Sequence, residues 1–295
     1  MNAGYVRSLL GPRKKDSNKG DYGHVLVLAG SRGMSGAAVL CTHGALRSGA
    51  GLVSLGIPES QQEIITARLR PEAMTVILPE RSGRLSSKAV APVREYVEKR
   101  KVTSLAVGPG LGNDPEVYRL VKRLLSALTV PLVLDADGLN VIAKASKRKD
   151  LAVQDLLQAK APLVVTPHPG EFSRLTGIPV SEIQKHRVEL AVNFARANGI
   201  VCVLKGYHTV ITDGYECFIN TTGNPGMAAG GTGDVLTGII AALAAQVKEP
   251  RLIHAAVAGV FLHGAAGDKA AREKTEISML AGDIIEMLPY AFGKK

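Results

Sequence analysis

The chain has 295 residues, a net charge of +10, 46% hydrophobic residues and 4% aromatic residues, with no tryptophan. This balance is typical of a soluble globular protein and excludes an intrinsically disordered one, and the aperiodic spacing of its 32 glycines excludes a collagen-like chain. Three scattered cysteines without a C-x-x-C pair argue against a disulfide framework and against a zinc site.

The chain carries no sign of export or membrane insertion. Residues 1–18 are polar and basic and lack the apolar segment of a secretory signal. The most apolar stretch, Val235–Val247, is too short to span a bilayer. We therefore expect a cytoplasmic protein without membrane association. The basic runs are not interleaved with aromatic residues, so nucleic-acid binding is not indicated; solvated faces and attraction of a polyanionic ligand explain the charge equally well.

Strand-like and helix-like segments alternate along most of the chain. Continuous runs of Val, Leu and Ile predict buried strands at 24–29, 51–55, 104–107, 131–135, 163–166 and 200–205. Helix-length segments follow at 36–47 and 115–127, and a helical region continues to 198. Because the strands do not alternate apolar with polar residues, we expect both faces of the sheet to be covered. The pattern predicts an α/β fold, a three-layer α/β/α sandwich with a mostly parallel central sheet.

The last third of the chain has a different pattern. Val210–Thr212 and Glu216–Ile219 flank an Asp-Gly turn and predict a hairpin. After Gly233 the chain reads as helical to its end, and the apolar segments Leu252–Leu262 and Ile277–Leu288 fit packing on the sheet or on another subunit. We expect one domain over 19–295, preceded by an extension at 1–18.

Several predicted strands end in small or polar residues. In an open α/β sheet, ligands bind beyond the carboxyl ends of the strands. Such segments follow five strands, at 29–37, 108–112, 135–140, 166–171 and 205–209. One Gly-rich turn alone is more often a tight connection, and Asp135 or Asp137 alone is more often a helix cap. The prediction of a site therefore depends on all five segments sharing one edge.

The strongest signal is Gly230-Gly231-Thr232-Gly233-Asp234, directly before an apolar helix expected over 234–246. Free N–H groups and the helix dipole would form an anion hole, here from Gly231, Thr232 and Gly233. Asp234 fits a favourable charge at a helix start. It also fits a general base that takes a proton from a hydroxyl as the oxygen attacks phosphorus, which makes it our candidate catalytic residue. A P-loop motif does not occur in the sequence.

In their joint occurrence and order, these segments resemble the ADP/ATP-dependent NAD(P)H-hydrate dehydratase family of the ribokinase-like superfamily. The matching segments are 19–24, 29–31, 35–38, 45–51, 108–112, 135–139, 166–171, 205–206 and 223–234. Members of this family restore hydrated NADH or NADPH to the normal cofactor with a nucleoside di- or triphosphate. The resemblance thus implies a ribokinase-like carbon–oxygen lyase that uses ADP or ATP with Mg²⁺. It implies no particular metal ligands.

The resemblance also implies roles for individual residues. The hydrated dinucleotide would contact Ala37, Gly110, His168 and Asp234. The adenine nucleotide would contact Lys205, Gly206, Tyr207, His208, Thr209 and Gly233. We expect a homo-oligomer. Many relatives carry an attached epimerase domain, and since only about eighteen residues precede the matching region here, we expect no epimerase activity.

Two other functions fit the same sequence. A ribokinase-like kinase acting on a vitamin precursor would leave the phosphate on its product, and segment 166–171 favours the dehydratase only through the resemblance. A non-catalytic nucleotide sensor would keep the fold, but a pure binder would not need the carboxylate of Asp234 at the anion hole. A purely structural protein fits least well.

Overall fold

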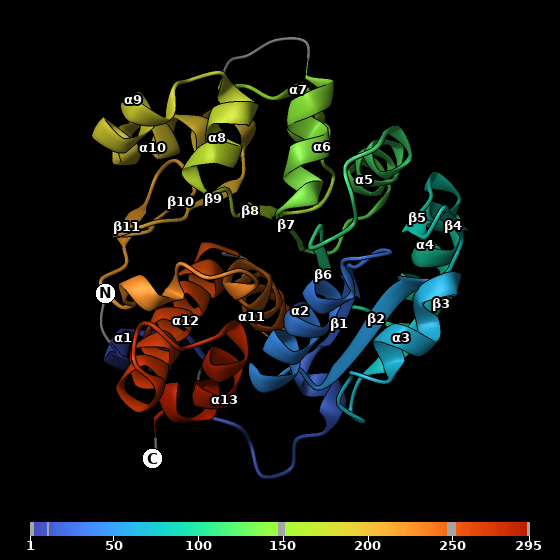
Figure 1. The fold of residues 1–295 in the computed structure, drawn as a ribbon, viewed down its shortest axis with the longest axis horizontal. Coiled ribbons are helices and arrows are strands. Elements are labelled where there is room, and N and C mark those ends of the chain that lie inside the picture. The colour runs from blue at the N-terminus through green and yellow to red at the C-terminus, as the bar shows by residue number, and fades with distance from the viewer. Residues whose placement is uncertain (1–2, 11, 147–150, 247–251, 294–295) are drawn as a thin grey trace.

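A nine-stranded sheet forms the centre of the structure, a computed structural model that describes residues 3–10, 12–146, 151–246 and 252–293 (Figure 1). The strand order is β11-β10-β9-β8-β7-β6-β1-β2-β3. Its strands are β1 (His24–Leu28), β2 (Leu52–Pro58), β3 (Met74–Leu78), β6 (Ser104–Val107), β7 (Leu132–Leu134), β8 (Leu163–Val165), β9 (Val201–Leu204), β10 (Val210–Thr212) and β11 (Cys217–Ile219). The pairings of β10 with β9 and with β11 are antiparallel, and the others are parallel, as predicted.

Two helix layers cover the sheet (Figure 1). One contains α4 (Val90–Arg100), α5 (Pro115–Ala127), α6 (Asp137–Ala145), α7 (Gln154–Leu157), α8 (Pro169–Thr176), α9 (Val180–Lys185) and α10 (Arg187–Asn198). The other contains α2 (Ser35–Arg47), α3 (Gln62–Thr66), α11 (Thr232–Gln246) and α12 (Leu252–Lys274), with α13 (Ala281–Ala291) outside them. Successive residues of a strand face opposite layers: Leu26 and Leu28 belong to the buried cluster that contains Phe172 of α8, whereas Val25 and Val27 belong to the cluster that contains Cys41 of α2. The predicted three-layer sandwich is confirmed.

Short elements complete the fold. A two-stranded ribbon pairs β4 (Glu80–Arg81) with β5 (Arg84–Leu85). Single turns of 3-10 helix are η1 (Lys19–Tyr22), η2 (Glu59–Gln61), η3 (Ser87–Ala89) and η4 (Pro225–Met227). Before them, α1 (Ala3–Leu10) packs against α12, and the Tyr5 ring stacks on Phe218 of β11 with centroids 6.0 Å apart. The segment 1–18 thus contributes contacts at the β11 edge of the sheet.

Helices α2 and α11 contact each other along their backbones. A Cβ added at Gly238 would lie 1.9 Å from the Cys41 carbonyl oxygen, and one at Gly44 would lie 2.6 Å from the Val235 carbonyl oxygen. At the far ends of the helices, the Gln246 amide donates to the Ser48 carbonyl at 3.0 Å. Only glycine permits this approach, so these two helices pack at backbone distance.

The carboxyl-terminal helices pack within the chain. Val257 and Val260 of α12 belong to the same buried cluster as Val203 of β9, which places α12 on the sheet. Helix α13 packs against α12 and α2. Of the two predicted alternatives, packing on the sheet or on another subunit, α12 therefore follows the first. The helix ends at Lys274, twelve residues beyond the predicted segment.

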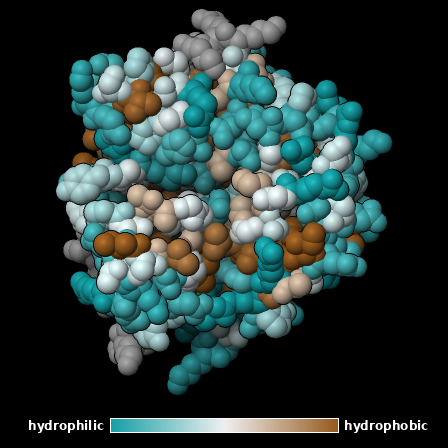
Figure 2. Space-filling model, in the orientation of Figure 1, coloured by the Kyte–Doolittle hydropathy of each residue, from teal (hydrophilic) through white to brown (hydrophobic). Residues whose placement is uncertain are grey.

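The surface in the orientation of Figure 1 is mainly hydrophilic, with apolar atoms gathered across its middle (Figure 2). Among the helices that the structure describes, none has both the length and the apolar character needed to cross a bilayer.

Candidate active site

The strand order reverses beside β1, where β2 pairs on one side and β6 on the other. At this point the Gly30 N–H donates to the Pro109 carbonyl at 2.8 Å, and the Ser31 hydroxyl donates to the Gly110 carbonyl at 2.7 Å. A Cβ at Gly110, whose φ is +62°, would lie 2.9 Å from the Ala37 Cβ. The two predicted substrate residues Ala37 and Gly110 therefore meet at the position where α/β sheets bind ligands.

Helix α11 begins at the predicted anion hole. Its first residue is Thr232, two residues before the predicted start, which makes Asp234 the third helical residue. Gly231 precedes it with a φ of +90°, and the Thr232 hydroxyl lies 2.9 Å and 3.0 Å from the carbonyls of Met227 and Ala229. The hydroxyl thus fixes the preceding loop, and the backbone N–H groups of the first turn remain the candidate anion donors.

The Asp234 carboxyl has an unusual proton affinity. Burial and the nearby Asp135 carboxylate raise its pKa to about 7, although the Lys205 ammonium opposes this rise. A base with a pKa near neutrality is deprotonated often enough to accept a proton and basic enough to hold it. Such perturbed groups concentrate at functional sites. The structure therefore gives Asp234 the proton affinity of a general base.

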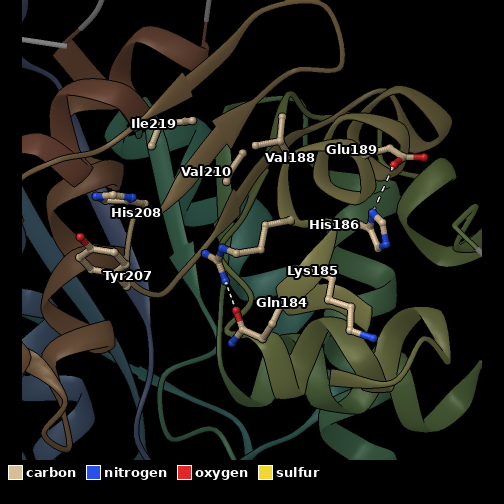
Figure 3. A pocket seen from close by; sticks show the side chains of 10 residues that line it. Gln184, Lys185, His186, Val188, Glu189, Tyr207, His208, Val210 and Ile219 are labelled. Atoms are coloured by element: carbon tan, nitrogen blue, oxygen red, sulfur yellow. Dashed lines mark hydrogen bonds and ion pairs between the residues drawn. The ribbon is translucent and has the colours of Figure 1, made fainter. Parts of the chain in front are cut away.

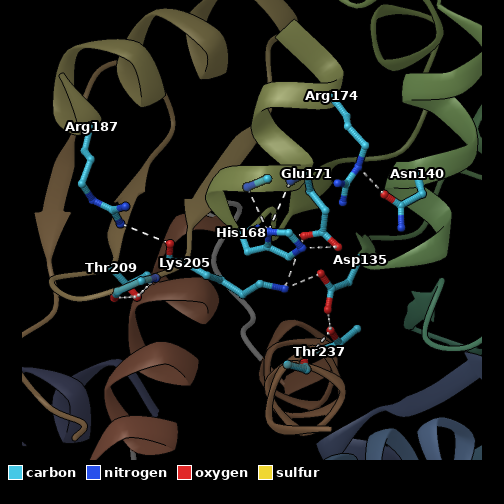
Figure 4. A network of polar contacts seen from close by, with 12 residues as sticks. Asp135, Asn140, His168, Glu171, Arg174, Arg187, Lys205, Thr209 and Thr237 are labelled. Atoms are coloured by element: carbon cyan, nitrogen blue, oxygen red, sulfur yellow. Dashed lines mark hydrogen bonds and ion pairs between the residues drawn. The ribbon is translucent and has the colours of Figure 1, made fainter. Parts of the chain in front are cut away.

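A buried charge cluster lies against this helix start (Figure 4). The Lys205 ammonium is 2.7 Å from one oxygen of Asp135 and 3.8 Å from Glu171, and Thr237 donates to the other Asp135 oxygen at 2.7 Å. Burial lowers the pKa of Lys205, but the Asp135 and Glu171 carboxylates outweigh it and keep that pKa above its ordinary value. A Cβ at Gly233 would lie 3.4 Å from the Lys205 nitrogen. Lys205 thus places a fixed positive charge beside the predicted anion hole.

His168 caps the N-terminus of helix α8 and faces the same cluster (Figure 4). Its Nδ1 accepts the N–H groups of Gly170 and Glu171 at 3.0 Å and 3.3 Å, so the ring proton of the neutral form lies on Nε2. Nε2 is 3.6 Å from a Glu171 oxygen. Burial and the Lys205 charge lower the pKa of His168, which favours a neutral ring. The half-exposed ring can therefore donate a hydrogen bond to a ligand.

The predicted nucleotide segment forms a tight turn after β9. The Thr209 hydroxyl donates to the Gly206 carbonyl at 2.9 Å, while Gly206 has a φ of +140° and His208 a φ of +53°. The Tyr207 side chain is 86% exposed and stacks on the His208 ring with centroids 3.9 Å apart. A hollow of about 500 Å³ lies beside this pair, between the hairpin and residues 184–189 (Figure 3). This hollow adjoins the nucleotide segment and does not include Asp234.

The structure adds three residues to the candidate site for which the sequence predicted no role. Asp135 and Glu171 were recognised only as polar residues at strand ends, and Thr237 was not recognised. Thr237 lies three residues after Asp234, on the same side of α11, and this helical spacing was the available signal. Within the described ranges, no three His, Cys, Asp or Glu side chains are arranged to hold a metal ion.

Comparison with known proteins gives a consistent result. The family model of the NAD(P)H-hydrate dehydratases matches residues 25–290. A bifunctional NAD(P)H-hydrate repair enzyme of Moorella thermoacetica is 46% identical over 98% of this chain, and the match covers 53% of that enzyme. The chain thus spans about half the length of this relative. An ADP-dependent (S)-NAD(P)H-hydrate dehydratase of Bacillus subtilis is 38% identical over 97% of this chain and 94% of its own length.

Solved structures agree with the sequence comparison. A crystal structure of the ADP/ATP-dependent NAD(P)H-hydrate dehydratase of Bacillus subtilis, co-crystallised with ATP and Mg²⁺, superposes with a TM-score of 0.82 at 35% identity. The superposition covers 99% of this chain and 96% of that one. A hydroxyethylthiazole kinase of Pyrococcus horikoshii, at 16% identity and a TM-score of 0.54, shares the fold alone. The ribokinase-like fold and the family match over most of the sequence show that this chain belongs to the NAD(P)H-hydrate dehydratase family.

Proposed function

We propose that this chain dehydrates hydrated NADH or NADPH at the expense of ADP or ATP and so restores the normal reduced cofactor. The observation that carries the proposal is Asp234, with a pKa of about 7, in the first turn of α11. There it stands beside backbone N–H groups and the Lys205 ammonium, the donors that a transferred phosphoryl group requires. The names of the relatives described above support the same substrate class.

The chemistry proceeds in two steps. Asp234 takes the proton from the ring hydroxyl while that oxygen bonds to the terminal phosphorus, and the bond from phosphorus to the nucleotide oxygen breaks. The lone pair of the ring nitrogen then expels the phosphate, and loss of a proton from the neighbouring carbon re-forms the double bond. Phosphate leaves far more readily than hydroxide, which is why the nucleotide is consumed.

The two ligands occupy neighbouring parts of the carboxyl edge in this proposal. The hydrated dinucleotide lies over Ala37 and Gly110, and the His168 Nε2 proton is available to it. The nucleotide extends from the 205–209 turn to Gly233, where the first turn of α11 holds its terminal phosphate. Asp234 stands where the two ligands meet.

Mg²⁺ is the expected companion of the nucleotide and neutralises part of its phosphate charge when bound. Mg²⁺ usually retains several waters and contacts one or two carboxylates together with the phosphates. Asp135 and Glu171 are carboxylates of this site, but their oxygens already accept bonds from Thr237 and from the His168 N–H. The Lys205 ammonium also lies 2.7 Å from Asp135 and 3.8 Å from Glu171, so these buried carboxylates do not fit as direct ligands of the ion.

The test is recovery of the reduced-nicotinamide absorbance when hydrated NADH and ADP or ATP are supplied together with Mg²⁺. We expect recovery that requires both the nucleotide and the intact Asp234. A vitamin-precursor kinase would give no recovery. It would instead phosphorylate a vitamin precursor that is supplied in place of the hydrate. Tight nucleotide binding without turnover of any hydroxylated substrate would favour a sensor. Preference for ADP or ATP follows from running the assay with each nucleotide in turn.

Homo-oligomerisation and cytoplasmic residence belong to the same proposal. A cytoplasmic location would give the enzyme both the reduced cofactor and the nucleotide. The mass of the purified chain in solution, measured by light scattering, tests the oligomeric state; a monomer would contradict it.

A further inference from the structure

We propose that Arg187 is the positioning residue that holds the nucleotide segment 205–209 in its binding conformation. This inference deepens the proposed function and rests on it, because it assumes that this segment binds the nucleotide. Arg187 is the first residue of α10, and it lines the hollow together with Tyr207 and His208. Arg187 lies outside the segments that carry the family resemblance, and the sequence predicted no role for it.

Arg187 binds the backbone where β9 ends. Its Nη2 donates to the Leu204 carbonyl at 2.9 Å and lies 3.3 Å from the Lys205 carbonyl, while Nη1 donates to the Gln184 amide oxygen at 3.1 Å (Figure 4). On the other side of the same residue, the Lys205 N–H donates to the Pro167 carbonyl at 2.9 Å. Both peptide units that flank the Lys205 Cα are therefore anchored, and this directs the Lys205 side chain toward Asp135.

The Arg187 guanidinium also lies against the turn itself. A Cβ at Gly206 would be 3.1 Å from Nη1 and 3.2 Å from Nη2, so the guanidinium packs directly on the Gly206 backbone. The φ of +140° at Gly206 is one that residues with a side chain rarely adopt. The planar fork of the guanidinium and the glycine backbone thus fit each other, and a lysine, with a single ammonium, could not reproduce this contact.

The charge of Arg187 is not neutralised by a carboxylate in the described part of the chain. Its hydrogen-bond partners are two carbonyls and an amide oxygen, and its Nε has no partner. A cation that binds only neutral groups adds a favourable potential for a polyanion at this edge of the sheet. Arg187 therefore serves the nucleotide in two ways, through the shape of the turn and through its charge.

Helix α10 supplies a matched control in Arg196. Its Nε and Nη2 donate to the Gly214 carbonyl at 3.0 Å and 2.7 Å, in the turn between β10 and β11. Arg187 and Arg196 thus make the same kind of contact, from α10 to backbone carbonyls at the ends of neighbouring strands, but only Arg187 contacts the nucleotide segment. Loss of Arg196 reports on the structural effect alone.

The experiment compares the full chain with Arg187→Met and Arg196→Met. ADP affinity with Mg²⁺ is measured by titration calorimetry, KM for the hydrate by absorbance recovery, and stability by thermal unfolding. We expect Arg187→Met to weaken ADP binding roughly tenfold, with the hydrate KM changed by less than about twofold. Arg196→Met should lower the unfolding temperature and leave both the ADP affinity and the hydrate KM unchanged. Equal ADP affinity in Arg187→Met and wild type, or equal loss in both variants, would overturn the inference.

A second variant keeps the test decisive if Arg187→Met does not fold. Arg187→Lys retains the charge and most of the stem but can no longer donate to two groups in one plane, so we expect it to fold and to recover only part of the ADP affinity. Full recovery would refute the role of the fork. Failure of the proposed function would look different from failure of this inference. In that case wild-type protein would bind ADP but would not convert the hydrate to the reduced cofactor.

Discussion

Replacement of Asp234 by asparagine should stabilise the fold while it removes turnover. The proposed reaction requires the carboxylate of Asp234, but folding places it in surroundings that disfavour its charge. Burial and the neighbouring Asp135 carboxylate raise its pKa from 3.8 to about 7. Asparagine has nearly the same shape and no charge, so Asp234→Asn removes the unfavourable charge and leaves the backbone of the anion hole in place.

The size of the effect follows from the two pKa values. They differ by about three pH units, and each unit corresponds to about 1.4 kcal/mol, so the charge costs the folded state at most about 4 kcal/mol. The side chain is only partly buried, and water reduces this cost. We expect a gain of about 1–2 kcal/mol in the free energy of unfolding at pH 8.

The pKa shift also determines how the stability difference between Asp234→Asn and wild type changes with pH. The pKa of Asp234 is higher in the folded state than in the unfolded state, so the cost is fully present above pH 7. It decreases as the pH falls through 7 and disappears only below pH 3.8, where both states are protonated. The stability difference between Asp234→Asn and wild type should therefore be large at pH 8 and small at about pH 4.5.

Urea unfolding at the two pH values measures this difference, with turnover assayed in parallel. Asp283→Asn is the matched control, because Asp283 is also the third residue of its helix and also follows a glycine. Its carboxylate accepts the Leu280 N–H at 2.7 Å, so its loss should cost about 0.5–1 kcal/mol. If Asp234→Asn were no more stable than wild type at pH 8, the electrostatic account of the site would be wrong. Near-normal turnover in that variant would show that Asp234 is not the base.

Three further predictions concern the same cluster. The kcat/KM for the hydrate should rise with pH to a plateau above about 7, because Asp234 must be deprotonated to act; a flat profile between pH 5 and 8 would contradict this. Lys205→Met should weaken nucleotide binding and move this rise to higher pH, since the Lys205 charge lowers the pKa of Asp234; an unmoved profile would exclude the coupling. Gly233→Val should block the anion hole, because a Cβ there already lies 3.4 Å from the Lys205 nitrogen; calorimetry with unchanged nucleotide affinity would refute the site.

The sequence predicted the centre of the sheet and the hairpin at its β11 edge, but not the opposite edge. Strands such as Val25–Leu28 and Leu105–Val107 are buried on both faces, and continuous apolar runs mark them clearly. Strand β3, Met74–Leu78, carries a similar apolar run, but it is an edge strand that is only partly buried, and it was not predicted. Helix α4 was missed because charged residues interrupt its apolar positions.

The site was predictable where glycine or a special turn marks it. Gly110, Gly206 and Gly233 occupy positions where a side chain would be strained or would contact a neighbour, and such positions leave a visible pattern. The partners of the catalytic groups leave none. Asp135 and Thr237 are 102 residues apart, and only the strand order brings them within 2.7 Å. Arg187 shows the same limit, because its partners are backbone carbonyls, which any residue provides.

The close approach of α2 and α11 at Gly44 and Gly238 limits how the protein can adapt. Helix α2 carries Ala37 near its start and α11 carries Asp234 near its start, so the separation of the two ligand sites is set by backbone packing. Larger side chains at the glycines would force the helices apart and displace both sites together. Engineering for a bulkier hydrate or a different phosphate donor would therefore have to leave this helix pair unchanged and alter the loops that follow β7, β8 and β9.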